Sequence, residues 1–138
     1  MKLLVFMAAS VLTINDLPPA VRAAVESQTK GAEIKTISKE TEDGKVRFEV
    51  ETLVNGKHRD IAIDTKGAVI EIEDEIAPAD APAAVRAAMA RKAVGGRIVT
   101  VETVTVGHAI AAYEAEYIDK NGRKREARFK PDGTPAPE

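Results

Sequence analysis

The strongest constraint on the fold of this chain is a short phrase that occurs twice. Residues 17–25 read LPPAVRAAV, and residues 81–89 read APAAVRAAM. The same offset pairs Gly31 with Gly95, and further along, after small shifts, two Asn-Gly dipeptides correspond. Helix, turn and strand signals recur in the same order, so the sequence predicts two copies of one unit within its 138 residues.

Each copy opens with a predicted helix. Asp16 and Asp80 are the predicted N-caps, because a short side-chain acceptor satisfies the free N–H groups of a first helical turn. Pro18, Pro19 and Pro82 fit that first turn, where no backbone donor is needed. Apolar residues then follow at helical spacing, and a glycine stands beyond each helix, where a left-handed backbone is favoured.

The apolar pattern then changes to the period of two that is typical of strands. Apolar and charged residues alternate from Val46 to Thr52, which predicts a strand with one buried face. The dipeptide Asn55-Gly56 predicts a hairpin turn, because both residues tolerate a positive φ. The second copy repeats this pattern from Tyr113 to Phe129, but prolines in residues 131–138 replace backbone donors that a closing strand would need.

These patterns predict an α+β fold of two tandem units, each with one helix packed on a three- to four-stranded antiparallel meander sheet. The two sheets could align side by side into one continuous sheet. The predicted parts are a signal peptide at residues 1–15, a first unit at 16–75, a linker at 76–80, a second unit at 81–134 and a frayed tail at 135–138.

The first fifteen residues have the pattern of an export signal. Lys2 precedes an uncharged run from Leu3 to Leu12, which has the length of a signal-peptide core and is too short to span a bilayer. A buried strand or a short helix is the alternative interpretation of this run. The sequence therefore predicts a periplasmic or secreted protein with no stable membrane span.

Several functional classes are excluded or disfavoured by composition. Cysteine is absent, so disulfides, zinc–thiolate sites and cysteine nucleophiles are excluded. His58 and His108, the two histidines, are expected at the surface, and the acidic run at residues 71–75 lacks the turn glycine of a calcium loop. A net charge of −2 disfavours nucleic acid as a partner. We therefore expect a non-enzyme that carries no metal and no other cofactor.

Four segments resemble the PepSY-like, beta-lactamase-inhibitor-like domain family. They are Leu17–Val21 (LPPAV), Gly31–Ile34 (GAEI), Phe48–Val50 (FEV) and the closing segment Asp64–Glu73 (DTKGAVIEIE). The resemblance covers roughly residues 16 to 134 and implies an exported bacterial protein with this tandem arrangement. The chain departs from the family where Thr29-Lys30 replaces an aromatic-Pro step before the glycine, and where the second unit lacks its closing strand.

The helix of each predicted unit can cover only one face of its sheet, so we expect the other face to bind a partner. The predicted function is a non-catalytic, inhibitor-like module that binds a protein or peptide of the cell envelope; the alternative is a small-molecule or metal-ion sensor with its ligand between the units. The sequence leaves the oligomeric state open. The predicted partner-binding residues are Lys45, Arg47, Glu49, Glu51, Glu114, Glu116, Lys124, Glu126, Arg128 and Lys130.

Overall fold

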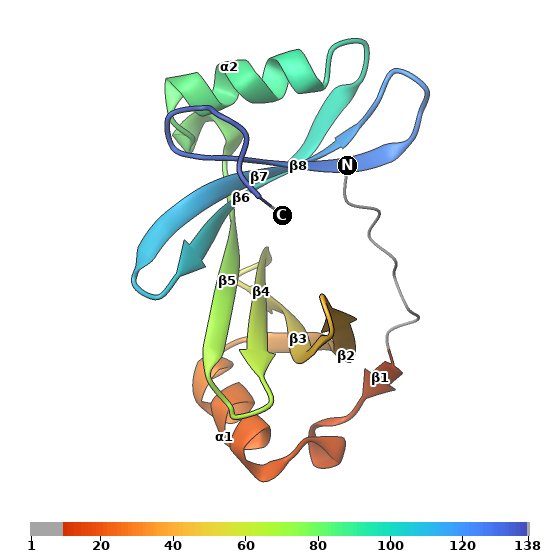
Figure 1. Cartoon of the computed structure of the whole chain (residues 1–138), viewed down its shortest axis with the longest axis vertical. Helices are drawn as coiled ribbons and strands as arrows, with labels where there is room; N and C mark the ends of the chain where they lie inside the picture. The colour runs from red at the N-terminus through yellow and green to blue at the C-terminus, as the bar shows by residue number, and fades with distance from the viewer. Residues whose placement is uncertain (1–9, 138) are drawn as a thin grey trace. The chain divides into compact units, whose positions relative to one another are not determined.

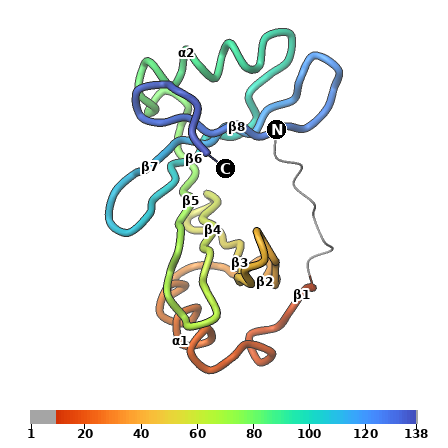
Figure 2. Tube along the Cα trace, viewed as in Figure 1, coloured from red at the N-terminus to blue at the C-terminus, as the bar shows by residue number. Residues whose placement is uncertain are grey.

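The structure, a computed structural model, describes residues 10–137. The first nine residues of the predicted signal peptide lie outside the described residues. The chain divides into two compact units, Met1–Ile72 and Glu73–Glu138, which are called unit 1 and unit 2. Figure 2 follows the chain through them from red to blue.

Unit 1 contains one α-helix and the first strands of the sheet (Figure 1). In chain order its elements are β1 (Ser10–Leu12), the 3-10 helix η1 (Ile14–Asp16), α1 (Pro19–Gln28), β2 (Glu33–Glu42), β3 (Lys45–Val54), β4 (Lys57–Asp64) and the start of β5 (Val69–Ile76). Unit 2 begins within β5 and continues with η2 (Pro78–Asp80), α2 (Ala83–Lys92), β6 (Arg97–Val106), β7 (Ala109–Ile118) and β8 (Lys124–Phe129).

The predicted fold class, two tandem helix-plus-sheet units, is wrong. Within residues 10–137 the strands form one eight-stranded antiparallel sheet in the order β1 to β8, and the two α-helices have ten residues each. The reason lies in β5, which runs unbroken to Ile76 through the predicted end of the first unit. At Asp74 its carbonyl accepts a hydrogen bond of 3.4 Å from the hydroxyl of Thr103 on β6. A strand has two hydrogen-bonding edges, and its sequence does not indicate what pairs with the second.

The core of unit 1 lies between α1 and the inner face of β2–β4. Val21 and Val25, one helical turn apart, are fully buried and pack on the sheet. The predicted alternation along β3 is confirmed, since Phe48, Val50 and Thr52 are all buried. The hydroxyl of Thr52 donates a hydrogen bond of 2.7 Å to a β4 carbonyl, which satisfies the one polar group on this face of β3.

The predicted N-caps are wrong for both helices. Helix α1 begins at Pro19 and α2 at Ala83, and the residue at each N-cap position is a proline. Asp16 instead closes η1, where its carboxylate accepts hydrogen bonds from the backbone and hydroxyl of Thr13, both 2.8 Å long. Proline forces the residue before it into an extended conformation, so the helix cannot start as early as the aspartate. Asp80 is likewise the last residue of η2, where its backbone N–H donates to the carbonyl of Ala77 at 2.9 Å.

A glycine in a tight turn fixes each helix against its sheet. Gly67, between β4 and β5, has φ +84°, and a Cβ there would lie 2.5 Å from the carbonyl oxygen of Ala20 in the first turn of α1. Gly133, beyond β8, has φ +85°, and a Cβ there would lie 2.6 Å from the carbonyl oxygen of Ala84 in α2. Only glycine permits both this backbone conformation and this approach.

The core of unit 2 is built in the same manner from α2 and the inner face of β6–β8. Val85 and Met89 of the helix pack against strand residues that include Tyr117 and Phe129. β8 is the last strand among residues 10–137, as the prolines predicted. In the predicted tail, Pro135 forms a β-bridge with Phe129, and the backbone N–H of Ala136 donates to a β8 carbonyl at 3.0 Å.

Candidate binding faces

Strand alternation places the predicted residues of unit 1 on the sheet face opposite α1. Because Phe48 and Val50 point toward the helix, Arg47, Glu49 and Glu51 point away from it. Lys45 lies on the same face at the start of β3 and is exposed, as is Glu51, whereas Arg47 and Glu49 are half-buried. The side of β2–β4 that faces away from α1 is called the open face of unit 1.

Arg47 connects β3 to β2 through two carboxylates. Its guanidinium lies 2.7 Å from a carboxylate oxygen of Glu42 and 3.6 Å from one of Glu40, and its side chain is 26% exposed. Both glutamates were missed by the sequence analysis. The signal that could have found them is the Asp43-Gly44 turn, which sets Glu42 opposite Lys45 and therefore places Glu40 opposite Arg47.

Glu49 is held in an environment that favours its neutral form. Burial raises the pKa of Glu49 to about 8, and the neighbouring carboxyl groups of Glu40 and Asp60 add to the rise. Arg47 acts in the opposite direction, but its positive charge is already shared with other carboxylates. A neutral Glu49 can donate a hydrogen bond to Glu40, so this acid carries a proton at neutral pH.

Arg128 organises the corresponding face of unit 2. Its Nε donates a hydrogen bond to Glu114, which lies directly opposite on β7. Its Nη2 donates to a carboxylate oxygen of Glu73 on β5 at 2.6 Å. The three side chains are 13–20% exposed, so this ion-pair network is largely shielded from water. Glu73 belongs to the acidic run at residues 71–75, and its contact with Arg128 could not be predicted across a sequence separation of 55 residues.

The other predicted residues of unit 2 are more accessible. Lys124 pairs with Glu116 at 2.8 Å, although the lysine side chain is 66% exposed. Glu126 is exposed directly opposite Glu116 in the β7–β8 pairing. Lys130 is exposed but lies beyond the end of β8, where its backbone N–H donates to Thr134, so its place in a turn differs from the predicted strand position.

The structure also places the histidines and an apolar hollow. His58 and His108 are both exposed, as predicted.

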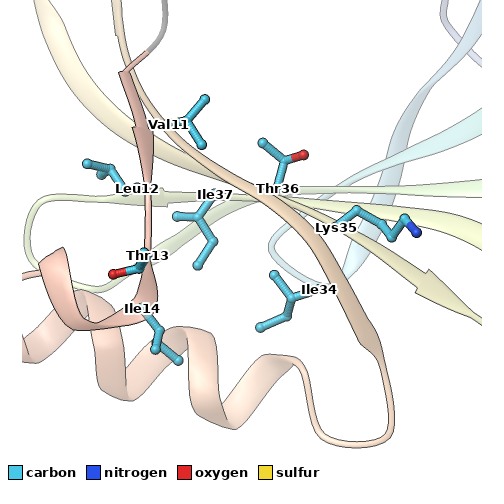
Figure 3. A pocket seen from close by; sticks show the side chains of 8 residues that line it. All are labelled: Val11, Leu12, Thr13, Ile14, Ile34, Lys35, Thr36 and Ile37. Carbon is cyan, nitrogen blue, oxygen red and sulfur yellow. The ribbon is translucent and has the colours of Figure 1, made fainter.

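A cavity of about 310 Å³ lies in unit 1 where the chain leaves β1 and diverges from β2 (Figure 3). It lies away from the predicted binding residues, and its lining is mostly apolar: Val11, Leu12, Thr13, Ile14, Ile34, Lys35, Thr36 and Ile37.

Among the described residues, no helix has the length and apolar character that crossing a membrane requires.

No family model matches the chain, and no curated protein matches it either. Similarity is found among solved structures. A protein from Bacteroides eggerthii that is described as periplasmic shares 18% identity over 88% of this chain and 86% of its own, with a TM-score of 0.66.

Two further structures extend this likeness. A DUF2874 family protein from Bacteroides uniformis is 20% identical over 87% of this chain and 86% of its own, with a TM-score of 0.64. A BLIP-like protein from Bacteroides fragilis is 15% identical over 88% of this chain and 84% of its own, with a TM-score of 0.57. The chain therefore has a BLIP-like fold, which it shares with DUF2874 family proteins.

Proposed function

We propose that this chain is a non-catalytic module of the cell envelope that binds a protein or peptide through the open faces of its sheet. The observation that carries the proposal is the same in both units. A helix packs on one face, and the other face presents ionisable side chains arranged around one half-buried arginine, Arg47 in unit 1 and Arg128 in unit 2.

Faces of this kind suit recognition better than chemistry. Carboxylates that are paired with guanidinium groups form a fixed pattern of charge that a partner surface can match. Exposed charges around such a centre, Lys45 and Glu51 in unit 1 and Lys124 and Glu126 in unit 2, can exchange water for partner groups at little cost.

The proposed location is the periplasm or the outside of the cell. The uncharged run from Leu3 to Leu12 supports export, and so does the fold shared with a Bacteroides eggerthii protein described as periplasmic. The BLIP-like neighbour supports protein binding as the activity. We also propose that the chain is related to PepSY-like domains. This rests on the segments LPPAV and FEV and on the similar sequences at residues 17–25 and 81–89.

A capture experiment with charge-reversed variants tests the proposal. The bait is the chain coupled to resin, the sample is periplasmic extract, and bound proteins are quantified by mass spectrometry. Arg47 and Arg128 are left unchanged because their ion pairs are half-buried, whereas the paired side chain of Lys124 is 66% exposed. The test variant reverses four exposed charges of the open faces with no change in net charge: Lys45→Glu, Glu51→Lys, Lys124→Glu and Glu126→Lys.

The matched control reverses four exposed charges that lie outside the open faces, again with no change in net charge: Glu26→Lys, Lys30→Glu, Asp80→Lys and Arg91→Glu. We expect specific partners to be lost by the test variant and retained by the control, with both variants folded by circular dichroism. Partners that survive the test variant, or that both variants lose equally, would contradict the proposed surface.

A further inference from the structure

The charges of unit 1 are sorted by sign between the two faces of its sheet. In the paired region of β2–β4, strand alternation puts basic side chains toward the helix side, at Lys39, Lys57 and Arg59. The open face of the same strands carries seven carboxylates against two basic groups: Glu33, Glu40, Glu42, Glu49, Glu51, Asp60 and Asp64, with Lys45 and Arg47. The open face therefore has a surplus of negative charge.

The two basic groups of this face both stand beside its acids. Arg47 is engaged by Glu40 and Glu42, and Lys45 lies directly opposite Glu42 in the β2–β3 pairing. The remaining acids include Glu49, which is half-buried between β2 and β4, and Glu51, which is exposed two residues further along the same strand. A partner can approach Glu51 from solvent and reach Glu49 beside it.

Unit 2 differs in this respect. On its open face Arg128 lies against Glu114 and Glu73, and Lys124 lies against Glu116. By register this face carries five acids against three basic groups, so its surplus of negative charge is smaller than that of unit 1: Glu73, Glu102, Glu114, Glu116 and Glu126, with Arg97, Lys124 and Arg128. The larger surplus, which attracts a cationic partner more strongly, belongs to unit 1.

We propose that the open face of unit 1 binds a cationic polypeptide segment, with its arginine or lysine side chains placed beside Glu49 and Glu51. This inference rests on the proposed binding function and names the class of its partner. Complementary charge speeds encounter and selects against acidic competitors, and each ionic contact at an exposed position adds a modest affinity.

Binding of such a segment is coupled to a proton. The groups that face Glu49 are Glu40 from β2, Arg47 and Glu51 on its own strand, and Asp60 from β4. Without a partner, the pKa of Glu49 is raised to about 8, so this group holds a proton at neutral pH. A cationic side chain beside it favours the ionised form and releases that proton, so affinity rises as the pH is raised toward 8.

Calorimetric titration with defined peptides tests the inference on the full chain. The probe is a twelve-residue Gly-Ser-Arg repeat, and its comparison is the same peptide with citrulline, which is neutral, in place of arginine. Glu51→Gln on the open face is compared with Glu26→Gln on α1, since both remove one exposed charge from unit 1. We expect Glu51→Gln to weaken the arginine peptide about 2- to 5-fold and Glu26→Gln to leave it unchanged.

The proton coupling gives a second, independent readout. Affinity of the arginine peptide should rise at least about threefold between pH 6 and pH 7.5, and a proton should be released on binding, as measured in buffers of different ionisation enthalpy. In Glu49→Gln this pH dependence should disappear. Equal binding of the citrulline peptide, equal losses in the two charge variants, or a pH profile unchanged by Glu49→Gln would overturn the inference.

Failure of this inference differs from failure of the proposed function. If the open-face variant loses specific partners in the capture experiment but the arginine peptide does not bind unit 1, the sheet faces bind a partner of other chemistry. If the capture experiment finds no dependence on the open faces, the proposed function itself falls, whatever the peptide does.

Discussion

Replacement of Glu49 by glutamine should make the protein more stable at neutral pH. The pKa of this carboxyl is raised from 4.5 to about 8 in the folded chain, chiefly by burial and then by Glu40 and Asp60. Between those two pH values the folded state holds a proton that the unfolded state releases. Stability from this group is therefore fully present below about pH 4.5 and is lost as the pH rises through 8.

The size of the effect follows from the shift. Each pH unit above 4.5 costs about 1.4 kcal/mol until the folded-state pKa is reached, which gives about 3 kcal/mol at pH 7 and about 5 kcal/mol above pH 8. Glutamine does not titrate, and its amide can donate to Glu40 as the protonated acid does. With an unfolding entropy of about 2.1 cal/mol/K per residue, Glu49→Gln should melt about 10 °C higher at pH 7.

The assay is thermal unfolding by circular dichroism from pH 4.5 to pH 9. The control is Glu51→Gln, an exposed position on the same strand and the same face. The stability gain of Glu49→Gln over the unmodified chain should be near zero at pH 4.5 and should grow steadily to pH 8. A gain that does not change with pH, or the same growth in Glu51→Gln, would refute the electrostatic account of the open face.

Two other substitutions test the packing and the ion-pair network. Gly133→Ala should destabilise by at least about 2 kcal/mol more than Gly122→Ala in chemical denaturation, because both glycines have a positive φ but only Gly133 has a carbonyl oxygen 2.6 Å from the new Cβ; equal losses would contradict the helix-docking role. Arg128→Ala should cost about 2–4 kcal/mol, because it leaves two shielded carboxylates without their cation. Arg125→Ala should cost less than about 1 kcal/mol, because the Arg125 side chain is 45% exposed in its ion pair with Asp119. Equal losses of stability in Arg128→Ala and Arg125→Ala would show that burial of the Arg128 network is unimportant.

The sequence predicted the local structure of this protein well where periodicity controls it. Alternation along β3 correctly separated Phe48 and Val50 from Arg47 and Glu49, because side-chain direction in a strand depends only on position. The same rule placed the exposed residues of β8. These are statements about one strand at a time, and a single sequence carries that information.

Long-range pairing could not be predicted in the same way. The continuation of β5 to Ile76, and with it one sheet in place of two, depends on which strand occupies its second edge. Glu73 meets Arg128 across 55 positions of sequence, and no local pattern indicates that contact. The helix starts were misjudged for a local reason, since the restriction that proline places on its predecessor outweighed the capping tendency of Asp16.

The most direct test of the central claim is a nuclear magnetic resonance titration of the ¹⁵N-labelled chain with the arginine peptide at pH 7.5. If the open face of unit 1 is the binding surface, the largest amide shift changes will fall on β3 and β4, including Glu49 and Glu51, and they will be absent with the citrulline peptide. If the largest changes fall on α1 or on unit 2, or if saturating peptide moves no resonance, the claim is wrong.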